Sequence, residues 1–471
     1  MKNNIAMIGL SVMGSNLALN MADHDFKVSI YNRTESVTRE VVAKYPHKNL
    51  FPVYSLEELA ASLESPRKIM LMVKAGKAVD AVIEQLLPLL SKGDIIIDGG
   101  NSYFADTQRR YDALLAHGIH YFGVGVSGGE EGARRGPAIM PGGDAEAYRA
   151  IQPILEGISA KVEGNACCAY TSTGGAGHYV KMVHNGIEYG DMQLISEIYL
   201  LLKHLGGFDN KALADIFSKY NQEELESYLI QITANIFKVT ENGEALVDKI
   251  LDTASQKGTG KWTNMQAAEL GVDVSVITAA LNGRFMSALK QERMRAEQIF
   301  AKPAYTQVSD KEALIQMVKE SLYLAKVISY AQGFKMLQAA EKEYNWNFTY
   351  AQIAKIFRGG CIIQAKLLQN IIDAYSKNPQ LDNLIFDDYF SHIVKANQES
   401  LRKVVSLAIA NHIAVPALSN ALSYLDTYTT ANSGANLIQA QRDYFGAHTF
   451  ERTDKEGHFH FDWVGYSNER A

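Results

Sequence analysis

The stretch Ile5-Ala-Met-Ile-Gly-Leu-Ser-Val-Met-Gly14 decides the fold of the first part of this chain. Its first four residues are apolar and predict a buried strand, and a helix is expected to begin at about Val12. The glycines at the two ends of the turn fit the G-x-G-x-x-G pattern, in which Ser11 replaces the middle glycine. Small residues let the backbone approach a pyrophosphate at a helix N-terminus, so the turn predicts a dinucleotide site. Its candidate ligands are Gly9, Leu10, Ser11, Val12, Met13 and Gly14. A tight turn without a ligand is the alternative.

Four further apolar runs follow before residue 176, and helical patterns separate them. The runs are Lys27–Tyr31, Ile69–Val73, Ile95–Asp98 and His120–Val126. They are mostly unbroken, as expected for strands that helices cover on both faces. This alternation predicts an α/β fold class, with a Rossmann-like domain and a mainly parallel sheet over residues 1–176.

The pattern becomes nearly all helical after the glycine-rich run Gly174–Gly177. Ser309-Asp-Lys-Glu312 has the spacing of a capping box and predicts the start of a long helix. Val415-Pro416 places a proline in a first helical turn. We therefore expect an all-α domain for substrate binding and dimerisation over residues 177–434. Residues 435–471 have no clear period and predict an irregular C-terminal tail.

Length, composition and charge exclude several classes of protein. A chain of 471 residues suggests two or three domains. The net charge of −6 provides no basic field for nucleic acid. No uninterrupted apolar stretch of about 20 residues occurs, and Gly9 and Gly14 interrupt the apolar start, so neither a membrane span nor a signal peptide is expected. The cysteines, Cys167, Cys168 and Cys361, have the spacing of neither a zinc site nor a disulfide framework. We expect a cytoplasmic protein without a metal.

The end of the second predicted strand indicates which nucleotide binds. NAD-binding folds usually place an acidic residue there to hold the ribose diol. This chain has Asn32, Arg33 and Thr34 instead, and an arginine beside a hydroxyl and an amide suits the extra phosphate of NADP. The sequence therefore favours NADP, although Glu35 leaves NAD open as the alternative.

Three more segments supply polar groups near strand ends. The third predicted strand runs into Val73-Lys74-Ala75, and the fourth into Asp98-Gly-Gly-Asn101. Both ends face the crevice where ligands bind in open α/β sheets. After the fifth strand, Ser127-Gly128-Gly129 offers a hydroxyl and uncrowded amides, which suit a carboxylate or a polyol. A flexible loop is the alternative for this last segment.

A polar stripe lies on a segment that is otherwise typical of a buried helix. Lys181, His184, Asn185 and Glu188 fall within an arc of roughly 100°. Because the lysine and the glutamate are two turns apart, with roughly 10 Å between their backbones, both can lean toward one small molecule. The stripe offers a base, an acid and two hydrogen-bonding groups. A solvated helix face is the alternative.

A glycine-rich segment near the middle of the chain is similar to a phosphate loop. In Lys257-Gly-Thr-Gly-Lys261, Trp262 stands where a Walker A motif needs serine or threonine. A lysine, a hydroxyl and glycine amides can still hold a phosphate. A connector between helices is the alternative.

These motifs together resemble the family of decarboxylating 6-phosphogluconate dehydrogenases, from one end of the chain to the other. The matching stretches are Gly9–Gly14, Asn32–Thr34, Asp98–Ser102, Ser127–Ala133, Lys181–Tyr189, Gln256–Thr263 and Gln441–His448. The wider β-hydroxyacid dehydrogenase group shares the nucleotide fold and the lysine helix, but not the last stretch. Three departures from the family pattern are Ser11, Arg135 and Ser255. None of them removes a catalytic group, although Ser255 makes the backbone before the phosphate loop less free than the usual glycine.

The resemblance implies oxidation of 6-phosphogluconate by NADP, with release of carbon dioxide and ribulose 5-phosphate, as in the pentose phosphate pathway and gluconate utilization. It implies that Lys181 is the general base for the 3-hydroxyl and that Glu188 protonates carbon 1 of the enediol. The lysine then needs a lowered pKa, from desolvation or a nearby cation, and the glutamate needs a raised one. No metal is required.

The resemblance also implies a set of substrate ligands and a partner. These ligands are Asn101, Ser127, Gly128, Gly129, His184, Asn185, Tyr189, Lys257, Arg284, Arg442 and His448. Asn101 belongs to the cofactor set as well. Lys257, Arg284 and Arg442 would meet the dianionic phosphate. Since the family's tail reaches into the neighbouring subunit, we expect a homodimer with shared active sites.

Two other functions are weighed against this one. A dehydrogenase for a small β-hydroxyacid such as hydroxyisobutyrate would leave the three phosphate-binding cations unpaired. A non-catalytic NADP-binding sensor would have little need of a lysine and a glutamate seven residues apart.

Overall fold

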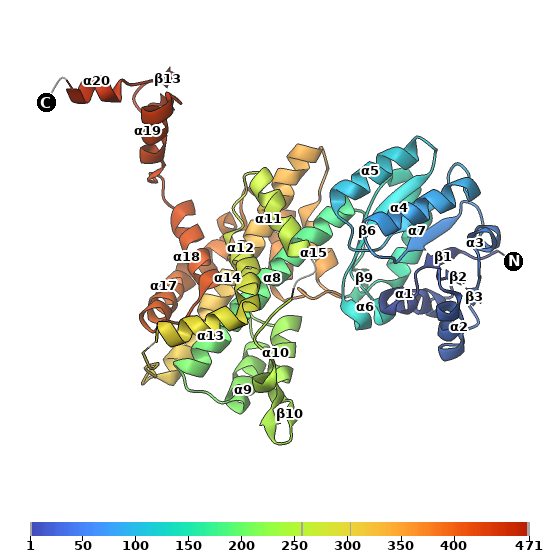
Figure 1. Ribbon diagram of the computed structural model, residues 1–471, viewed down its shortest axis with the longest axis horizontal. Helices are drawn as coiled ribbons and strands as arrows, with labels where there is room; N and C mark the ends of the chain where they lie inside the picture. The colour runs from blue at the N-terminus through green and yellow to red at the C-terminus, as the bar shows by residue number, and fades with distance from the viewer. Residues whose placement is uncertain (1, 256–257, 302, 469–471) are drawn as a thin grey trace. The chain divides into compact units, whose positions relative to one another are not determined.

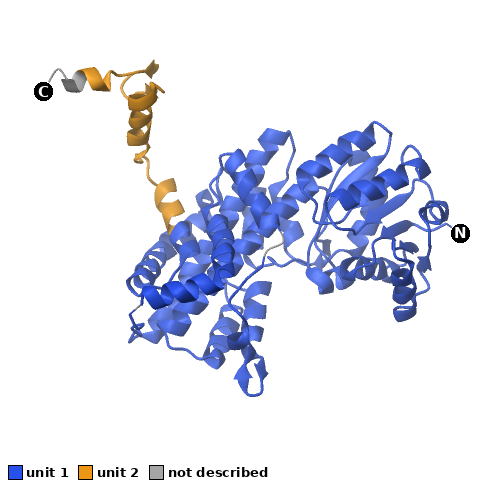
Figure 2. Cartoon of the chain, in the orientation of Figure 1, with its two compact units in different colours: residues 1–421 blue, residues 422–471 orange. Residues whose placement is uncertain are grey.

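The computed structural model describes residues 2–255, 258–301 and 303–468 (Figure 1). The chain forms two compact units, Met1–Ala421 and Leu422–Ala471 (Figure 2). The first unit contains a sheet with its covering helices and a larger helical part. Within the described residues, no helix is both long and apolar enough to cross a membrane.

The sheet has seven strands in the order β3-β2-β1-β4-β5-β6-β7. All neighbours are parallel except β6 and β7, which are antiparallel. The strands are β1 (Ile5–Ile8), β2 (Val28–Tyr31), β3 (Leu50–Pro52), β4 (Lys68–Leu71), β5 (Ile95–Asp98), β6 (His120–Val126) and β7 (Ile139–Gly142). The order reverses direction at β1, so a crevice opens at the carboxyl ends of β1 and β4, where open α/β sheets bind ligands.

Successive residues of each buried strand point to opposite faces of the sheet, and both faces are apolar. Ile5 and Met7 of β1 belong to the core under α1 and α7. Ala6 and Ile8 belong to the core under α3, α4 and α5. The helices around the sheet are α1 (Val12–Asp23), α2 (Glu35–Lys44), α3 (Leu56–Ser62), α4 (Lys77–Leu86), α5 (Phe104–Leu115), α6 (Gly129–Arg135) and α7 (Ala145–Ile158).

The five predicted strands are all present in the sheet, and two strands of this sheet were not predicted. The predicted strand Ile69–Val73 ends two residues earlier, at Leu71. The missed strands β3 and β7 lie at the two edges of the sheet, and each contains a proline. Proline lacks an amide donor and is tolerated at sheet edges, so these short segments gave no strand pattern in the sequence.

The predicted helical part follows the sheet. Its helices are α8 (Ala176–His204), α9 (Asn210–Tyr220), α10 (Tyr228–Lys238), α11 (Thr259–Glu269), α12 (Ser275–Ala288), α13 (Lys290–Ile299), α14 (Lys311–Tyr344), α15 (Tyr350–Phe357), α16 (Leu367–Lys377), α17 (Asp388–Ala410) and α18 (Pro416–Tyr428). Helix α8 packs against β6 and β7 at its start and against α11, α12 and α14 further along (Figure 1). It therefore joins the sheet to the helical part.

The first residues of α14 and α18 can be compared with the helix starts predicted from the sequence. Helix α14 begins one residue later than the predicted capping box, because Asp310 rather than Ser309 is the N-cap and accepts a hydrogen bond from the Ala313 amide at 2.9 Å. Helix α18 begins at Pro416, as predicted. Short elements complete the first unit, namely β8 (Lys161–Val162), β9 (Asn165–Ala166), β10 (Thr240–Glu241) and β11 (Glu244–Ala245).

The second unit carries the predicted tail. Besides irregular segments it contains α19 (Ala435–Gly446), β12 (Phe450–Glu451), β13 (His458–Phe459) and α20 (Trp463–Asn468). Helix α19 was not predicted. Its only buried residue in the described structure is Asp443, whereas its apolar residues Leu437, Ile438, Tyr444 and Phe445 are exposed.

Candidate active site

The turn between β1 and α1 has the geometry of a dinucleotide site. Gly9 has φ +96°, which favours glycine, and a Cβ on Gly14 would lie 1.9 Å from the Gly9 carbonyl oxygen. Ser11 is the N-cap of α1, yet its side chain makes no capping hydrogen bond to any described residue. The first-turn amides of Val12 and Met13 therefore have no partner within the helix and can receive a pyrophosphate.

Asn32 holds this turn from the neighbouring strand. Its side-chain oxygen accepts a hydrogen bond from the Leu10 amide at 3.2 Å, and its side-chain nitrogen donates to the Thr34 carbonyl at 3.2 Å. Arg33 is exposed between them. Glu35, the alternative ribose ligand, accepts a hydrogen bond from Arg39 at 2.8 Å. The carboxylate is therefore already paired with a neighbouring cation.

A cavity of about 290 Å³ opens beside these residues. Its lining brings together the predicted segments at three strand ends. The lining residues are Ile8, Gly9, Tyr31, Asn32, Arg33, Thr34, Leu56, Val73, Lys74, Ala78, Ala81, Val82 and Gln85. Lys74 is exposed, and Ala75 follows it half-buried. The cations at its edge and the free amides of α1 fit a dinucleotide that carries an additional phosphate.

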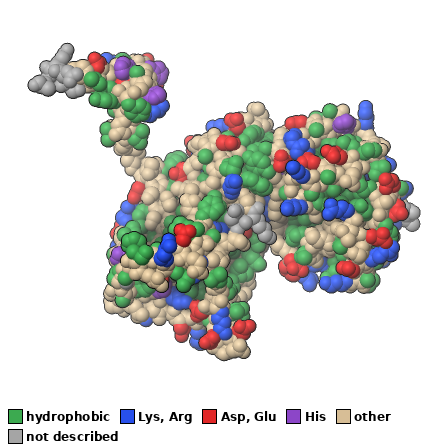
Figure 3. All heavy atoms as spheres, in the orientation of Figure 1, with side chains coloured by type: hydrophobic (Ala, Val, Ile, Leu, Met, Phe, Trp, Pro, Cys, Tyr) green, Lys and Arg blue, Asp and Glu red, His purple; other side chains and the backbone are tan. Residues whose placement is uncertain are grey.

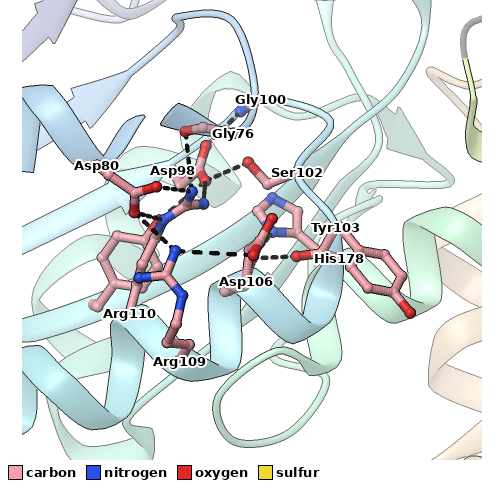
Figure 4. Close-up of polar contacts among 12 residues, drawn as sticks. Gly76, Asp80, Asp98, Gly100, Ser102, Tyr103, Asp106, Arg109, Arg110 and His178 are labelled. Atoms are coloured by element: carbon pink, nitrogen blue, oxygen red, sulfur yellow. Dashed lines mark hydrogen bonds and ion pairs between the residues drawn. The ribbon is translucent and has the colours of Figure 1, made fainter. Parts of the chain in front are cut away.

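The loop that leads to Asn101 is built on a buried carboxylate. Asp98, at the end of β5, accepts hydrogen bonds from the Gly100 amide at 3.0 Å, from Ser102 Oγ at 2.6 Å and from Tyr121 at 3.0 Å (Figure 4). The loop is thus held at both ends while Asn101 stays exposed. Asn101 is free to contact a ligand in the crevice.

Arg110, on α5, connects this loop to the one after β4. Its guanidinium donates two hydrogen bonds to Asp80, at 2.8 and 3.2 Å, and one to the Gly76 carbonyl at 3.1 Å. It also lies 3.7 Å from the Asp98 carboxylate, and its side chain is only 2% exposed (Figure 4). The predicted cofactor segments at residues 73–75 and at Asn101 therefore share one buried cation.

The polar stripe of α8 is buried. Lys181 is 7% exposed, His184 is fully covered and Asn185 is 8% exposed. The Glu188 side chain is 22% exposed. The alternative of a solvated helix face is therefore wrong, because the sheet covers this part of α8 on one side and other helices cover it on the other.

His184 is the centre of the contacts among these side chains. Its Nε2 lies 3.3 Å from Ser127 Oγ, which brings the loop after β6 to the helix. Its Nδ1 lies 3.1 Å from Asn185 Oδ1, 3.5 Å from Lys181 Nζ and 3.8 Å from the Glu188 carboxylate. The lysine and the glutamate thus flank one imidazole beside the Ser127 hydroxyl.

Burial shifts the pKa values of the two charged groups in opposite directions. It lowers the pKa of Lys181, and the negative charge of Glu188 opposes this shift. It raises the pKa of Glu188, against the positive charges of Lys181 and Arg284. Burial also holds the pKa of His184 well below its ordinary value, and Lys181 lowers it further. The site therefore favours a neutral amine, a neutral carboxylic acid and a neutral imidazole.

Two of the predicted substrate ligands, Tyr189 and Arg284, lie at the far end of the stripe. The Arg284 guanidinium sits 3.7 Å from the centre of the Tyr189 ring and donates to the Ser255 carbonyl at 3.0 Å. Tyr189 and Arg284 line a cavity of about 450 Å³. Lys257 lies outside the described residues. Arg284 thus places a cation in this cavity next to Tyr189, which follows Glu188 on α8.

Models of two protein domains match nearly the whole chain. Residues 4–172 match the NAD binding domain of 6-phosphogluconate dehydrogenase, and residues 177–463 match the C-terminal domain of 6-phosphogluconate dehydrogenase. The chain belongs to the 6-phosphogluconate dehydrogenase family. The predicted resemblance is thereby confirmed.

Relatives and a solved structure agree with this family. The NADP(+)-dependent, decarboxylating 6-phosphogluconate dehydrogenase of Bacillus subtilis (strain 168) is 56% identical over 466 residues, which cover 98% of this chain and 99% of the relative. The decarboxylating 6-phosphogluconate dehydrogenase of Escherichia coli (strain K12) is 53% identical, with the same coverage. The 6-phosphogluconate dehydrogenase of Plasmodium falciparum, solved in its apo form and with NADP+ or 6-phosphogluconate, matches with a TM-score of 0.95 and 45% identity over 98% of this chain and 100% of that chain.

The remaining predicted ligands of this 6-phosphogluconate dehydrogenase family member lie in the second unit. Arg442 and His448 are exposed, near the end of α19 and just after it. Between them, Asp443 accepts hydrogen bonds from the Thr449 amide at 2.9 Å, from His460 at 3.0 Å and from Trp463 Nε1 at 2.8 Å. Burial acts to raise the pKa of Asp443, but these hydrogen bonds outweigh it and lower the pKa to about 2. The unit therefore folds around a carboxylate next to its predicted ligands.

Three residues near the site were not predicted. Arg110 is buried under two cofactor loops, Gly360 contacts the Ser127–Gly129 loop, and the charge of Lys181 acts on the buried Cys361 thiol. A charged arginine on a helix that covers the sheet is a signal in the sequence that could have indicated Arg110. No sequence signal connects the Gly359-Gly360-Cys361 segment to a loop more than 200 residues earlier.

Proposed function

We propose that this protein oxidises and decarboxylates 6-phosphogluconate with NADP, giving NADPH, carbon dioxide and ribulose 5-phosphate. The observation that carries the proposal is the pair of buried side chains on α8, Lys181 and Glu188, whose pKa values burial shifts in the directions that a base and an acid need. The B. subtilis relative is named as NADP(+)-dependent and decarboxylating.

The cofactor would be held by the first turn of α1 and the cations near β2. The amides of residues 12–14 suit the pyrophosphate, and Arg33 suits the 2′-phosphate. Lys74, Ala75 and Asn101 would approach the nicotinamide half from the loops that Arg110 joins. NADP, when bound, supplies the hydride acceptor for carbon 3 of the substrate.

Lys181 performs the first proton transfer in this proposal. As a neutral amine it takes the proton of the 3-hydroxyl while carbon 3 is oxidised to a ketone. The resulting β-keto acid loses its carboxylate as carbon dioxide, and the electron pair of the broken bond moves toward the keto oxygen. Lys181, now protonated, stabilises the charge that develops on this oxygen.

Glu188 completes the reaction. As a neutral acid it protonates carbon 1 of the enediol, while the hydroxyl that becomes the keto group of the ketose gives its proton to Lys181. Solvent then takes this proton from Lys181 and restores that of Glu188, whose side chain is partly exposed. His184, Asn185 and Ser127 would hold the substrate by hydrogen bonds. Tyr189, Arg284 and Lys257 would bind its phosphate end, and Gly128 and Gly129 would offer backbone amides to its carboxylate.

The proposal includes a homodimer with shared sites. Arg442 and His448, from the tail of one subunit, would complete the phosphate end of the site in the other. Large apolar side chains are exposed on α12 and α13, among them Phe285, Met286 and Ile299, which is 64% exposed. Figure 3 shows hydrophobic side chains at the surface of the first unit. Such a surface is common where a second subunit binds. In this scheme residues 1–176 bind NADP, residues 177–434 bind substrate and the partner, and residues 435–471 reach that partner.

The test follows NADPH absorbance and carbon dioxide release together after NADP and 6-phosphogluconate are added. Equal amounts of both products are expected. Folded protein that forms neither product at saturating ligand would refute the proposal. A cytoplasmic location belongs to the same proposal, because all three cysteines are buried and free, as is usual in a reducing compartment.

A further inference from the structure

The segment Phe357–Cys361, at the end of α15, lies against both parts of the proposed substrate site. On one side, the edge of the Phe357 ring meets the imidazole of His184, with 5.3 Å between ring centres and 73° between planes. On the other side, the Gly360 carbonyl accepts a hydrogen bond from the Ala138 amide at 2.8 Å. The segment therefore contacts α8 and the region after β6 at once.

Ala138 also forms a hydrogen bond with the Ser127–Gly129 loop. Its own carbonyl accepts a hydrogen bond from the Ser127 amide at 3.0 Å. Ser127 Oγ lies 3.3 Å from His184 Nε2. Polar contacts thus connect Gly360 through Ala138 and Ser127 to His184. The ring contact between His184 and Phe357 connects the histidine back to the segment Phe357–Cys361.

Two glycines make the close approach possible. A Cβ on Gly128 would lie 2.4 Å from the Gly360 carbonyl oxygen. A Cβ on Gly360 would lie 2.4 Å from the Gly136 carbonyl oxygen and 2.7 Å from the Ala138 nitrogen, and Gly360 has φ +68°. Because the obstructing atoms belong to the backbone, a side chain at either position would force the two segments apart.

Other contacts keep the segment in place. The Arg358 guanidinium donates to Glu163 at 3.1 Å and to Gln369 at 2.9 Å, and it is 12% exposed. The Cys361 thiol donates to the Phe357 carbonyl at 3.1 Å and is buried. The segment is thus fixed to the helical part and to the β8–β9 hairpin before it meets the substrate loop.

We propose that Gly360 and Phe357 are positioning residues, which fix the Ser127–Gly129 loop relative to His184 and so place the substrate against Lys181. This inference rests on the proposed function. Neither residue needs to touch the substrate. A shift of about 1 Å in such a loop can reduce turnover by roughly a hundredfold, so a small displacement is enough to be measured.

The test compares Gly360→Ala with Gly271→Ala. Gly271 has a similar φ of +64°, but no described atom lies within 4 Å of a Cβ placed there. Both variants therefore carry the same kind of backbone strain, and only Gly360→Ala separates the two segments. Gly360→Ala is expected to lower kcat/KM for 6-phosphogluconate at least about tenfold, while the Kd for NADP stays within about twofold of wild type. Gly271→Ala should change neither constant.

The possible outcomes separate the two proposals. Wild-type protein without turnover would refute the proposed function. If wild type is active and the two alanine variants have the same kcat/KM, only the positioning role is refuted. Should Gly360→Ala fail to fold, Phe357→Leu decides, because it keeps an apolar side chain and removes the ring edge from His184. A lowered kcat/KM with unchanged NADP binding supports the role, and wild-type kinetics refute it.

Discussion

Lys181 and Glu188 lie on either side of His184 on one helix, and burial lowers the pKa of the lysine while it raises that of the glutamate. Burial thus shifts both groups toward their neutral forms, although the charge of each opposes the shift of the other. Activity should therefore fall as pH drops through the pKa of Lys181, which protonates the base. It should also fall as pH rises through the pKa of Glu188, which removes the acid. We expect a bell-shaped profile of kcat/KM against pH, whose limbs belong to the coupled pair.

Substitution separates the two roles. Lys181→Met should abolish NADP reduction and leave the Kd for NADP near that of wild type, because no cofactor segment includes this residue. Glu188→Gln should slow the late protonation most, so NADPH and carbon dioxide should form before ribulose 5-phosphate appears. Stopped-flow NADPH absorbance with product analysis measures both effects. Near-normal turnover of Lys181→Met would show that the base is another group.

Arg33 should determine the preference for NADP. Arg33→Ala removes a charge-assisted contact and should weaken NADP binding by about 1.5–3 kcal/mol, roughly ten- to a hundredfold, with little effect on NAD. Arg39→Ala is the control, because Arg39 lies nearby on α2 but pairs with Glu35. Fluorescence titration with both nucleotides measures the change. Equal losses for the two variants would mean that the 2′-phosphate is bound elsewhere.

Shared sites predict recovery of activity in a mixed dimer. Subunits with Lys181→Met and with Arg442→Ala should each be nearly inactive alone. After unfolding and refolding together, half of the dimers carry one of each, and one of the two sites in such a dimer is intact. About a quarter of wild-type activity should return. A mixture as inactive as its components would place each tail in its own subunit's site.

Arg110 should matter far more than its neighbour Arg109. Both contact Asp80, but Arg109 is 57% exposed, whereas Arg110 also reaches Gly76 and Asp98. Arg110→Met leaves the buried carboxylate of Asp98 and the partly exposed one of Asp80 without this cation, and it should cost about 3–5 kcal/mol of unfolding free energy, together with NADP affinity. Arg109→Met should cost at most about 1 kcal/mol. Urea unfolding and NADP titration of both variants measure the two effects. Equal losses of stability and NADP affinity in the two variants would contradict this prediction.

The sequence was most informative where a residue pattern is local. The β1 strand and the α1 start depend on neighbouring residues, and both were predicted to the residue. The edge strand β7 was not predicted because it contains Pro141, and a proline within a short run argues against a strand. In the structure β7 nevertheless pairs with β6. The polar stripe on α8 was visible as a pattern, but its burial depends on elements far along the chain. A helix sequence does not reveal what covers it.

Contacts between distant segments account for the rest. Gly360 meets Gly128 by backbone atoms, which carry no residue-specific signal. In the sequence, Arg110 does not differ from other charged helix residues. Its importance depends on Asp80 and Asp98, which lie beside it only in the folded chain. The family and its fold were predicted correctly from the motifs, whereas the roles of individual site residues remain predictions for the experiments above.

Helix α8 carries more than the proposed catalytic pair. Its first turns place His178 2.7 Å from Thr107 on α5, and further along Glu197 accepts the amides of Ala417 and Leu418, at 2.8 and 2.9 Å, in the first turn of α18. Inserting or deleting one residue would turn everything after it by about 100° and shift it by about 1.5 Å. The amides of α18 would then lose their carboxylate. Related enzymes should therefore vary in the residues of this helix but not in its length, and gain or lose residues only in loops.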